Sequence, residues 1–232
     1  MDTEKILSNI IKDYQRTVGG SKAIANIRDK VEKGIATYAD ADGAAVACGR
    51  ALNSAFKKYL PEALTDGYMF REYAETIIRQ PVVRGARDVA DITRRIQRLL
   101  NDKAGIGLDA IVPDLNMDQV NGIITGICNA AFADISDEFM SQIENLLLGY
   151  VDDFAHDNAD FAYEAGLTPT IQRTAYSKCC EWCDALAGIY NYEDVRDRNN
   201  DVFRRHDNCR CLVMYTPAGS KRRQNVRTRS WT

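Results

Sequence analysis

Cysteine and histidine side chains gather in the last quarter of this chain, at the short spacings that metal sites use. Five of the seven cysteines and one of the two histidines fall within residues 179–211. They are Cys179, Cys180, Cys183, His206, Cys209 and Cys211. Thiolates and a neutral imidazole are the ligands that Zn²⁺ prefers in a tetrahedral site. The spacing therefore predicts a zinc centre built from two knuckles, Cys180-x2-Cys183 and His206-x2-Cys209.

The fourth ligand of this predicted site has two candidates. Cys180, Cys183 and His206 supply three ligands. Cys209 and Cys211 lie two residues apart, and such residues face the same side of a strand, so their thiols compete for the last position. We favour Cys209 slightly, because it completes the second knuckle. These five residues form the Cys/His cluster. Four protein ligands leave no open coordination position, so we expect the ion to be structural.

The composition gives no global bias toward nucleic acid or membrane. The net charge is −3 and 45% of the residues are apolar, which is ordinary for a globular protein. No stretch approaches the ~20 apolar residues of a membrane span, and charges interrupt the segment where a signal peptide would need an apolar run. We therefore expect a reducing compartment. There, an odd number of cysteines indicates metal binding more than a disulfide framework.

The motifs of enzymes that use such residues are missing. A zincin requires His-Glu-x-x-His, and a zinc nucleobase deaminase requires His-x-Glu ahead of Pro-Cys-x-x-Cys; the chain contains neither. A thioredoxin-like redox pair would lie in a βαβ unit, whereas only helices are expected ahead of the Cys180-x2-Cys183 pair. A cysteine nucleophile paired with His206 is the remaining enzyme alternative, and the surplus thiols argue against it. We predict no catalytic residues and no enzymatic activity.

The elements that must position the cluster are mainly α-helical. Apolar residues recur at helical spacing through residues 3–166, with glycine and proline breaks, and predict a multi-helix body of about seven helices over residues 1–166. The expected helices run from residue 3 to 19, from 21 to 38, over 41–60, to about 79, over 82–101, over 116–131 and from 136 to 166. The Gly- and Asp-rich segment 102–115 offers an internal boundary.

The pattern changes after Pro169, and predicts a small zinc-stabilised antiparallel β module over residues 167–216. Segments 170–176, 188–192 and 211–216 have strand character. Residues 217–232 are expected to form a basic flexible tail. Its cations are candidate contacts to nucleic-acid phosphates, without sequence preference. They are Lys221, Arg222, Arg223, Arg227 and Arg229.

Three further features have ordinary structural interpretations. His156 lies beside Asp157 on the last long helix and is expected to be a surface histidine. Cys48 and Cys128 lie in apolar helical patterns and are expected to be small core residues. The arginines of residues 84–98 alternate with acids, which favours a solvated face with ion pairs over a phosphate-binding stripe.

The cluster and its flanks resemble the C-terminal signature of phage minor capsid or head-morphogenesis proteins, the Mu F-like family. The resemblance rests on Cys-x-x-Cys-x-x-Leu186-x-Gly188 followed by Arg205-His206-x-x-Cys-x-Cys, and covers about residues 170–216. Asp207 departs from the family, which more often has proline after the histidine. The resemblance implies zinc at Cys180, Cys183, His206 and Cys209 or Cys211.

The same resemblance implies a structural virion protein inside the capsid, near the portal and the packaged DNA. Portal or other capsid proteins would be its partners, and the host cytoplasm its location before assembly. The alternative is a cellular zinc-dependent protein that binds nucleic acid or has a regulatory role. Sequence-specific binding without any association with capsids would distinguish this alternative.

Overall fold

The structure, a computed structural model, describes residues 2–176, 179–206 and 209–217. The fold is mainly helical with a small antiparallel sheet near its C-terminal end, as expected. Seven α-helices precede residue 167 in this described part: α1 (Thr3–Gly19), α2 (Lys22–Glu32), α3 (Tyr38–Tyr59), α4 (Arg71–Ile77), α5 (Arg79–Ala104), α6 (Met117–Asn129) and α7 (Phe132–Glu164). None of the described helices combines the length and the apolar character needed to cross a membrane.

Side-chain caps explain several of the helix boundaries. The side chains of Asp2, Ser21 and Asn116 each accept a hydrogen bond from a backbone N–H three residues later. Gly166 follows α7 with a φ of 83°, and the N–H of Leu167 reaches back to a carbonyl in the last turn. A residue with positive φ at this position is the usual end of an α-helix. These boundaries were predictable.

The segment after Pro61 differs from the expected helix. A 3-10 turn (Leu60–Ala63) leads into a hairpin of β1 (Leu64–Thr65) and β2 (Tyr68–Met69), and only then does α4 begin. Asp66 and Gly67 form the turn with φ angles of 51° and 85°. An Asp-Gly pair favours this backbone conformation, so the hairpin had a local signal that the apolar pattern concealed.

Two other boundaries are corrected. Pro81 does not separate two helices but lies in the first turn of α5, where its missing N–H leaves no helical bond unmade. The second helix does not reach residue 38. It ends at Glu32, Gly34 has a φ of 67°, and Ile35 is 57% exposed. Tyr38 instead begins α3, whose capping box uses Thr37.

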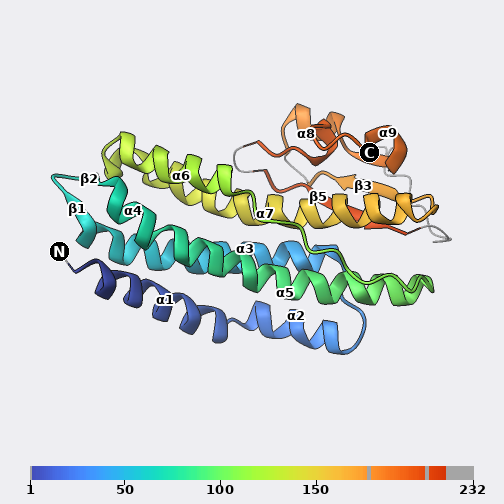
Figure 1. The fold of residues 1–232 in the computed structure, drawn as a ribbon, viewed down its shortest axis with the longest axis horizontal. Helices are drawn as coiled ribbons and strands as arrows, with labels where there is room; N and C mark the ends of the chain where they lie inside the picture. The colour runs from blue at the N-terminus through green and yellow to red at the C-terminus, as the bar shows by residue number, and fades with distance from the viewer. Residues whose placement is uncertain (1, 177–178, 207–208, 218–232) are drawn as a thin grey trace, which may run out of the picture.

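The long helices lie side by side and enclose one apolar core (Figure 1). α3 packs against α1, α5 and α7 and is the central helix of the body. Two glycines permit close crossings: Gly49 faces Glu144 of α7, and Gly85 faces Leu52 of α3. The sheet lies on the side of α7 away from α1 and α2 (Figure 1).

The sheet has the order β4-β3-β5, with both pairs antiparallel. Its strands are β3 (Thr170–Thr174), β4 (Gly188–Asn191) and β5 (Leu212–Thr216), which confirms the three expected strands. Between them lie two short helices and a 3-10 turn: α8 (Glu181–Ala185), α9 (Tyr192–Val195) and Asp201–Phe203.

Side chains of this sheet belong to the core of the helical body. Ile171, Val213 and Tyr215 are buried and join the same apolar cluster as α3 and α7. The sheet is therefore packed onto the helices through these apolar side chains. The division into a body and a module stays a prediction about folding.

Candidate metal centre

The start of α8 positions the first knuckle. Cys180 is the N-cap residue of α8, and its Sγ lies 3.5 Å from the backbone nitrogen of Cys183, which donates to it. Cys183 follows within the first turn. A helix start therefore presents two thiols to the same side, as a Cys-x-x-Cys knuckle requires.

The second knuckle approaches the first within ligand distances. The Nε2 of His206 lies 3.3 Å from Cys180 Sγ and 3.0 Å from Cys183 Sγ. The Sγ atoms of Cys183 and Cys209 are 3.8 Å apart. Ligand bonds of about 2.3 Å to sulfur and 2.0 Å to nitrogen give tetrahedral edges of about 3.5–3.8 Å. The sulfur–sulfur edge matches this size, and the two sulfur–nitrogen edges are slightly shorter.

Cys183 belongs to two overlapping groups of potential ligands. One group contains Cys180, Cys183 and His206, and the other contains Cys183, Cys209 and Cys211. Within each group the ligand atoms all lie within 4.8 Å of one another. All five predicted ligands therefore converge on one place, and these Cys/His groups could hold a metal ion such as zinc. Both contested thiols are within reach.

The two contested thiols differ in their electrostatics. A hydrogen bond from the Cys211 thiol lowers the pKa of Cys209 to about 4, with Arg205 and Arg173 acting in the same direction. The pKa of Cys211 is raised by that hydrogen bond and by burial. Both side chains are buried. The thiolate is the form that binds a metal, so these opposite pKa directions favour Cys209 over Cys211 as the ligand.

Arg173 is the residue beside the cluster that sequence reasoning missed. It lies on β3, is completely buried, and points its Nη2 at Cys209 Sγ, 3.8 Å away. Its Nη1 donates to the carbonyl oxygens of Val202 and Arg204 at 2.7 and 2.9 Å. Its guanidinium also lies over the ring of Trp182, 5.3 Å from the centroid. The alternation of β3 places Arg173 on the same face as buried Ile171, and this was the available signal.

A buried ion pair fixes the second knuckle to the helices. Arg205, next to His206, donates to both carboxylate oxygens of Asp152 on α7, and its Nη2 lies 2.7 Å from the Oδ1 atom. Asp42 on α3 lies 3.9 Å from the same guanidinium. Asn145 on α7 donates to the carbonyl of His206 at 3.4 Å. The knuckle is therefore tied to the helical body by polar contacts.

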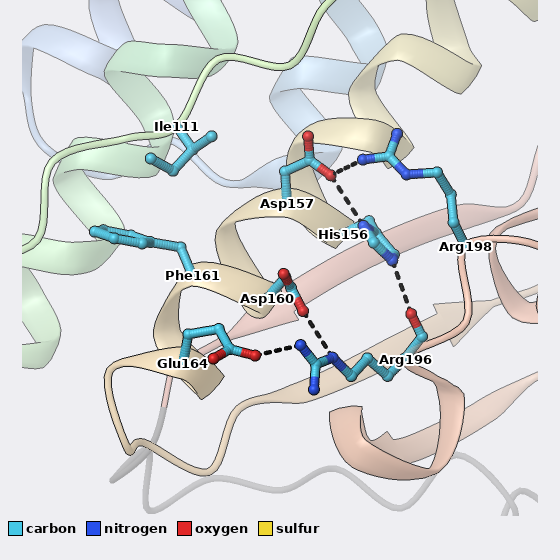
Figure 2. Close-up of a pocket in the computed structure, with 8 residues that line it drawn as sticks. All are labelled: Ile111, His156, Asp157, Asp160, Phe161, Glu164, Arg196 and Arg198. Carbon is cyan, nitrogen blue, oxygen red and sulfur yellow. Dashed lines mark hydrogen bonds and ion pairs between the residues drawn. The ribbon is translucent and has the colours of Figure 1, made fainter.

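His156 is buried, so the expectation of a surface histidine is wrong. Its Nδ1 lies 2.9 Å from Asp157 and its Nε2 lies 3.1 Å from the carbonyl oxygen of Arg196 (Figure 2). The side chain is covered because the segment from α9 to the 3-10 turn packs across α7, with Phe203 against the imidazole ring. The apolar pattern of a helix cannot show that a later segment of the chain will pack over one of its side chains.

A pocket of about 530 Å³ lies beside His156, between α7 and this segment (Figure 2). Its charged lining is already paired within the chain. Arg196 forms ion pairs with Asp160 and Glu164, and Arg198 forms one with Asp157. We assign no ligand to this pocket.

The remaining predicted residues lie away from the cluster or outside the described part. Arg94 and Arg98 pair with Asp109, and Arg95 pairs with Asp91, as a solvated face requires. Cys48 is buried in the core, and Cys128 is partly buried.

The cations of the tail, residues 221–229, lie outside the described residues. Cys179 packs against the buried thiols of the cluster.

Comparisons of this chain with protein-family models, curated proteins and solved structures give no match.

Proposed function

We propose that this protein is a minor head protein of a phage, with a structural zinc ion in the Cys/His cluster. The observation that carries the proposal is the convergence of both motif halves on one group of ligand atoms. Leu186 and Gly188 of the same motif end α8 and begin β4. A signature whose parts are far apart in sequence thus forms one local unit.

Cys180, Cys183, His206 and Cys209 would hold the ion. Zinc bound there supplies a crosslink between α8 and the segment that precedes β5. Arg205 and Asn145 connect this segment to α7. The proposed role of the metal is therefore to fix the end of the chain on the helical body, without chemistry on a substrate.

We further propose that the helical body docks to portal or other capsid proteins inside the head. The cations of residues 221–229 would contact packaged DNA without sequence preference, since several adjacent positive charges neutralise phosphates. The experiment is co-expression of the full chain with the portal and major capsid proteins of its own genome. Isolated heads are then analysed by mass spectrometry and for zinc.

The expected result is that the chain co-purifies with heads and carries one zinc per copy. Cys183→Ser should lose the metal, whereas Cys128→Ser, a matched change away from the cluster, should keep it. Protein purified without chelator that holds no zinc and has paired thiols would overturn the metal site. Absence from heads, with sequence-specific DNA binding, would instead favour a cellular regulatory protein.

DNA binding is tested separately with a chain that ends at Pro217. Each phosphate that the tail neutralises adds about 0.9 to the slope of log K against log salt. The full chain should show a steep slope that the shortened chain loses. Equal binding by the two chains would remove the tail from the proposal and leave the arginines of α5 as the candidate contact.

A further inference from the structure

We propose that Arg173 is the buried counter-ion of the metal centre and the positioning residue that selects Cys209 over Cys211 as fourth ligand. The inference rests on the proposed zinc site. It adds a residue outside the knuckle motif, and it assigns that residue a role that can fail while the metal site stands.

The burial of Arg173 calls for a negative partner. A guanidinium removed from water is strongly destabilising unless it is paired with an opposite charge. The other buried arginine, Arg205, has such a partner in Asp152. Arg173 forms no ion pair with a carboxylate among the described residues. Its polar contacts there are backbone carbonyl oxygens and the sulfur of Cys209.

The charge of the proposed centre matches this need. Zn²⁺ with three thiolates and one neutral imidazole carries 2 − 3, a net charge of −1. One guanidinium in contact with a ligand sulfur cancels it. A fourth thiolate would leave an additional buried negative charge without a partner. The contact of Arg173 with Cys209 therefore favours Cys180, Cys183 and Cys209 as the three thiolates, with Cys211 outside the coordination shell.

The geometry fixes which sulfur receives the contact. One guanidinium nitrogen is held by the carbonyl oxygens of Val202 and Arg204, and the planar group lies over Trp182. The other terminal nitrogen then lies 3.8 Å from Cys209 Sγ, and no hydrogen bond from it to Cys211 is formed. A donor that is hydrogen-bonded to a ligand orients it and stabilises its charged form.

Cobalt binding to the full chain tests this role, because Co²⁺ reports thiolate ligation through its sulfur-to-metal charge-transfer absorption. Arg173→Met removes the charge with little change in length, and Arg173→Lys keeps the charge but loses the planar fork. Arg196→Met is the matched control. Arg196 also fixes the segment before the second knuckle, through ion pairs with Asp160 and Glu164. These ion pairs involve no cysteine.

We expect Arg173→Met to bind cobalt about 10–100-fold more weakly than the wild type, and Arg173→Lys to recover most of that loss. Arg196→Met should bind like the wild type. Adding Cys211→Ser should leave the wild-type spectrum unchanged. In the Arg173→Met background it should alter the spectrum, because the two thiols then share the fourth position.

Three results would be decisive against parts of the argument. A wild-type chain that binds neither cobalt nor zinc removes the metal site itself. Wild-type affinity in Arg173→Met, with the metal site intact, removes the role of Arg173. If circular dichroism shows that Arg173→Met does not fold, the cobalt affinity of Arg173→Lys alone tests the role of Arg173. A loss of metal in folded Arg173→Lys as large as that caused by Cys183→Ser would show that the fork, not the charge, is needed.

Discussion

Cys209 and Cys211 have the same side chain and lie two residues apart, but their surroundings differ. Cys209 accepts hydrogen bonds and lies 3.8 Å from the sulfur of Cys183. Hydrogen bonding to Cys209 and Cys183, together with burial, raises the pKa of Cys211. A ligand must be deprotonated, so the difference decides which thiol binds at lower cost.

We therefore predict that Cys211→Ser keeps one zinc per chain and that Cys209→Ser loses most of it. Zinc release followed with a chromogenic chelator measures both variants against the wild type. Equal retention by the two would show that either thiol completes the site. Loss in Cys211→Ser alone would reverse the assignment.

Asp153 on α7 gives a pH prediction that does not involve the metal ligands. Burial raises its pKa to about 6, opposed by Arg198 and His156 and assisted by Asp152 and Asp157. The usual pKa of an aspartate is about 3.9, so the folded state binds more protons than the unfolded state between these values. The contribution of this carboxyl to the free energy of unfolding therefore falls as the pH rises from about 4 to 6 and is level above that range.

Asp153→Asn removes this titration. At pH 7.5 the variant should be more stable than the wild type by on the order of 1 kcal/mol, and the difference should shrink toward pH 5. Urea unfolding at several pH values measures both curves. A difference that is constant with pH would show that the carboxyl titrates at its ordinary value.

At this scale the sequence predicts residue types and spacing but not what surrounds them. The five candidate ligands could be proposed from the sequence because each knuckle places its ligand residues at a short, recognisable spacing. Arg173, by contrast, gains its role from carbonyls about thirty residues later in the chain. Asp152 and Arg205 meet only because the sheet packs on α7, and neither has a local motif.

Among the elements, the crossing of α3 and α7 depends on the absence of one side chain. A Cβ at Gly49 would lie 2.9 Å from Glu144 Cγ and 3.2 Å from its Cα. The side chain can move, but the backbone contact requires the helices to separate. Gly122 of α6 is the matched case, since no described atom would lie within 4 Å of its Cβ.

We predict opposite effects of the same substitution at these two sites. Gly122→Ala should raise the free energy of unfolding by about 0.5–1 kcal/mol, because alanine favours the helix. Gly49→Ala should lower it by roughly 1–3 kcal/mol, because overpacking exceeds that gain. Urea unfolding of both variants is the measurement. Stabilisation at residue 49 would mean that the helices separate easily.

Helices with caps and periodic apolar residues were predictable because their signals are local. Asp2, Ser21 and Asn116 begin helices where expected. The hairpin at residues 64–69 was missed, because Asp66-Gly67 lies within an apolar pattern that also suits a helix. The cover over His156 was missed, because it depends on contacts with residues 196–203.

For the whole molecule, α7 is the element that connects the other long helices to the sheet. One side of it packs on α3, α5 and α6, and β5 packs against it as well. Buried Ile171 and Val213 place part of the sheet in the common core, whereas the thiols of the cluster form a separate small group. The sheet therefore depends on apolar packing, whereas the cluster would depend on the proposed metal ligation.

This difference predicts what removal of the metal does. Chelation should expose residues 180–183 and 209–211, whose apolar contacts are few, while β3, β5 and the helices keep their packing. Hydrogen exchange with and without chelator should show faster exchange in those two segments and little change in residues 3–166. Cys183→Ser should reproduce the pattern without chelator, and Cys128→Ser should not. If β5 and α7 lose protection together with the cysteines, the metal stabilises the whole fold and the chain unfolds as one cooperative unit.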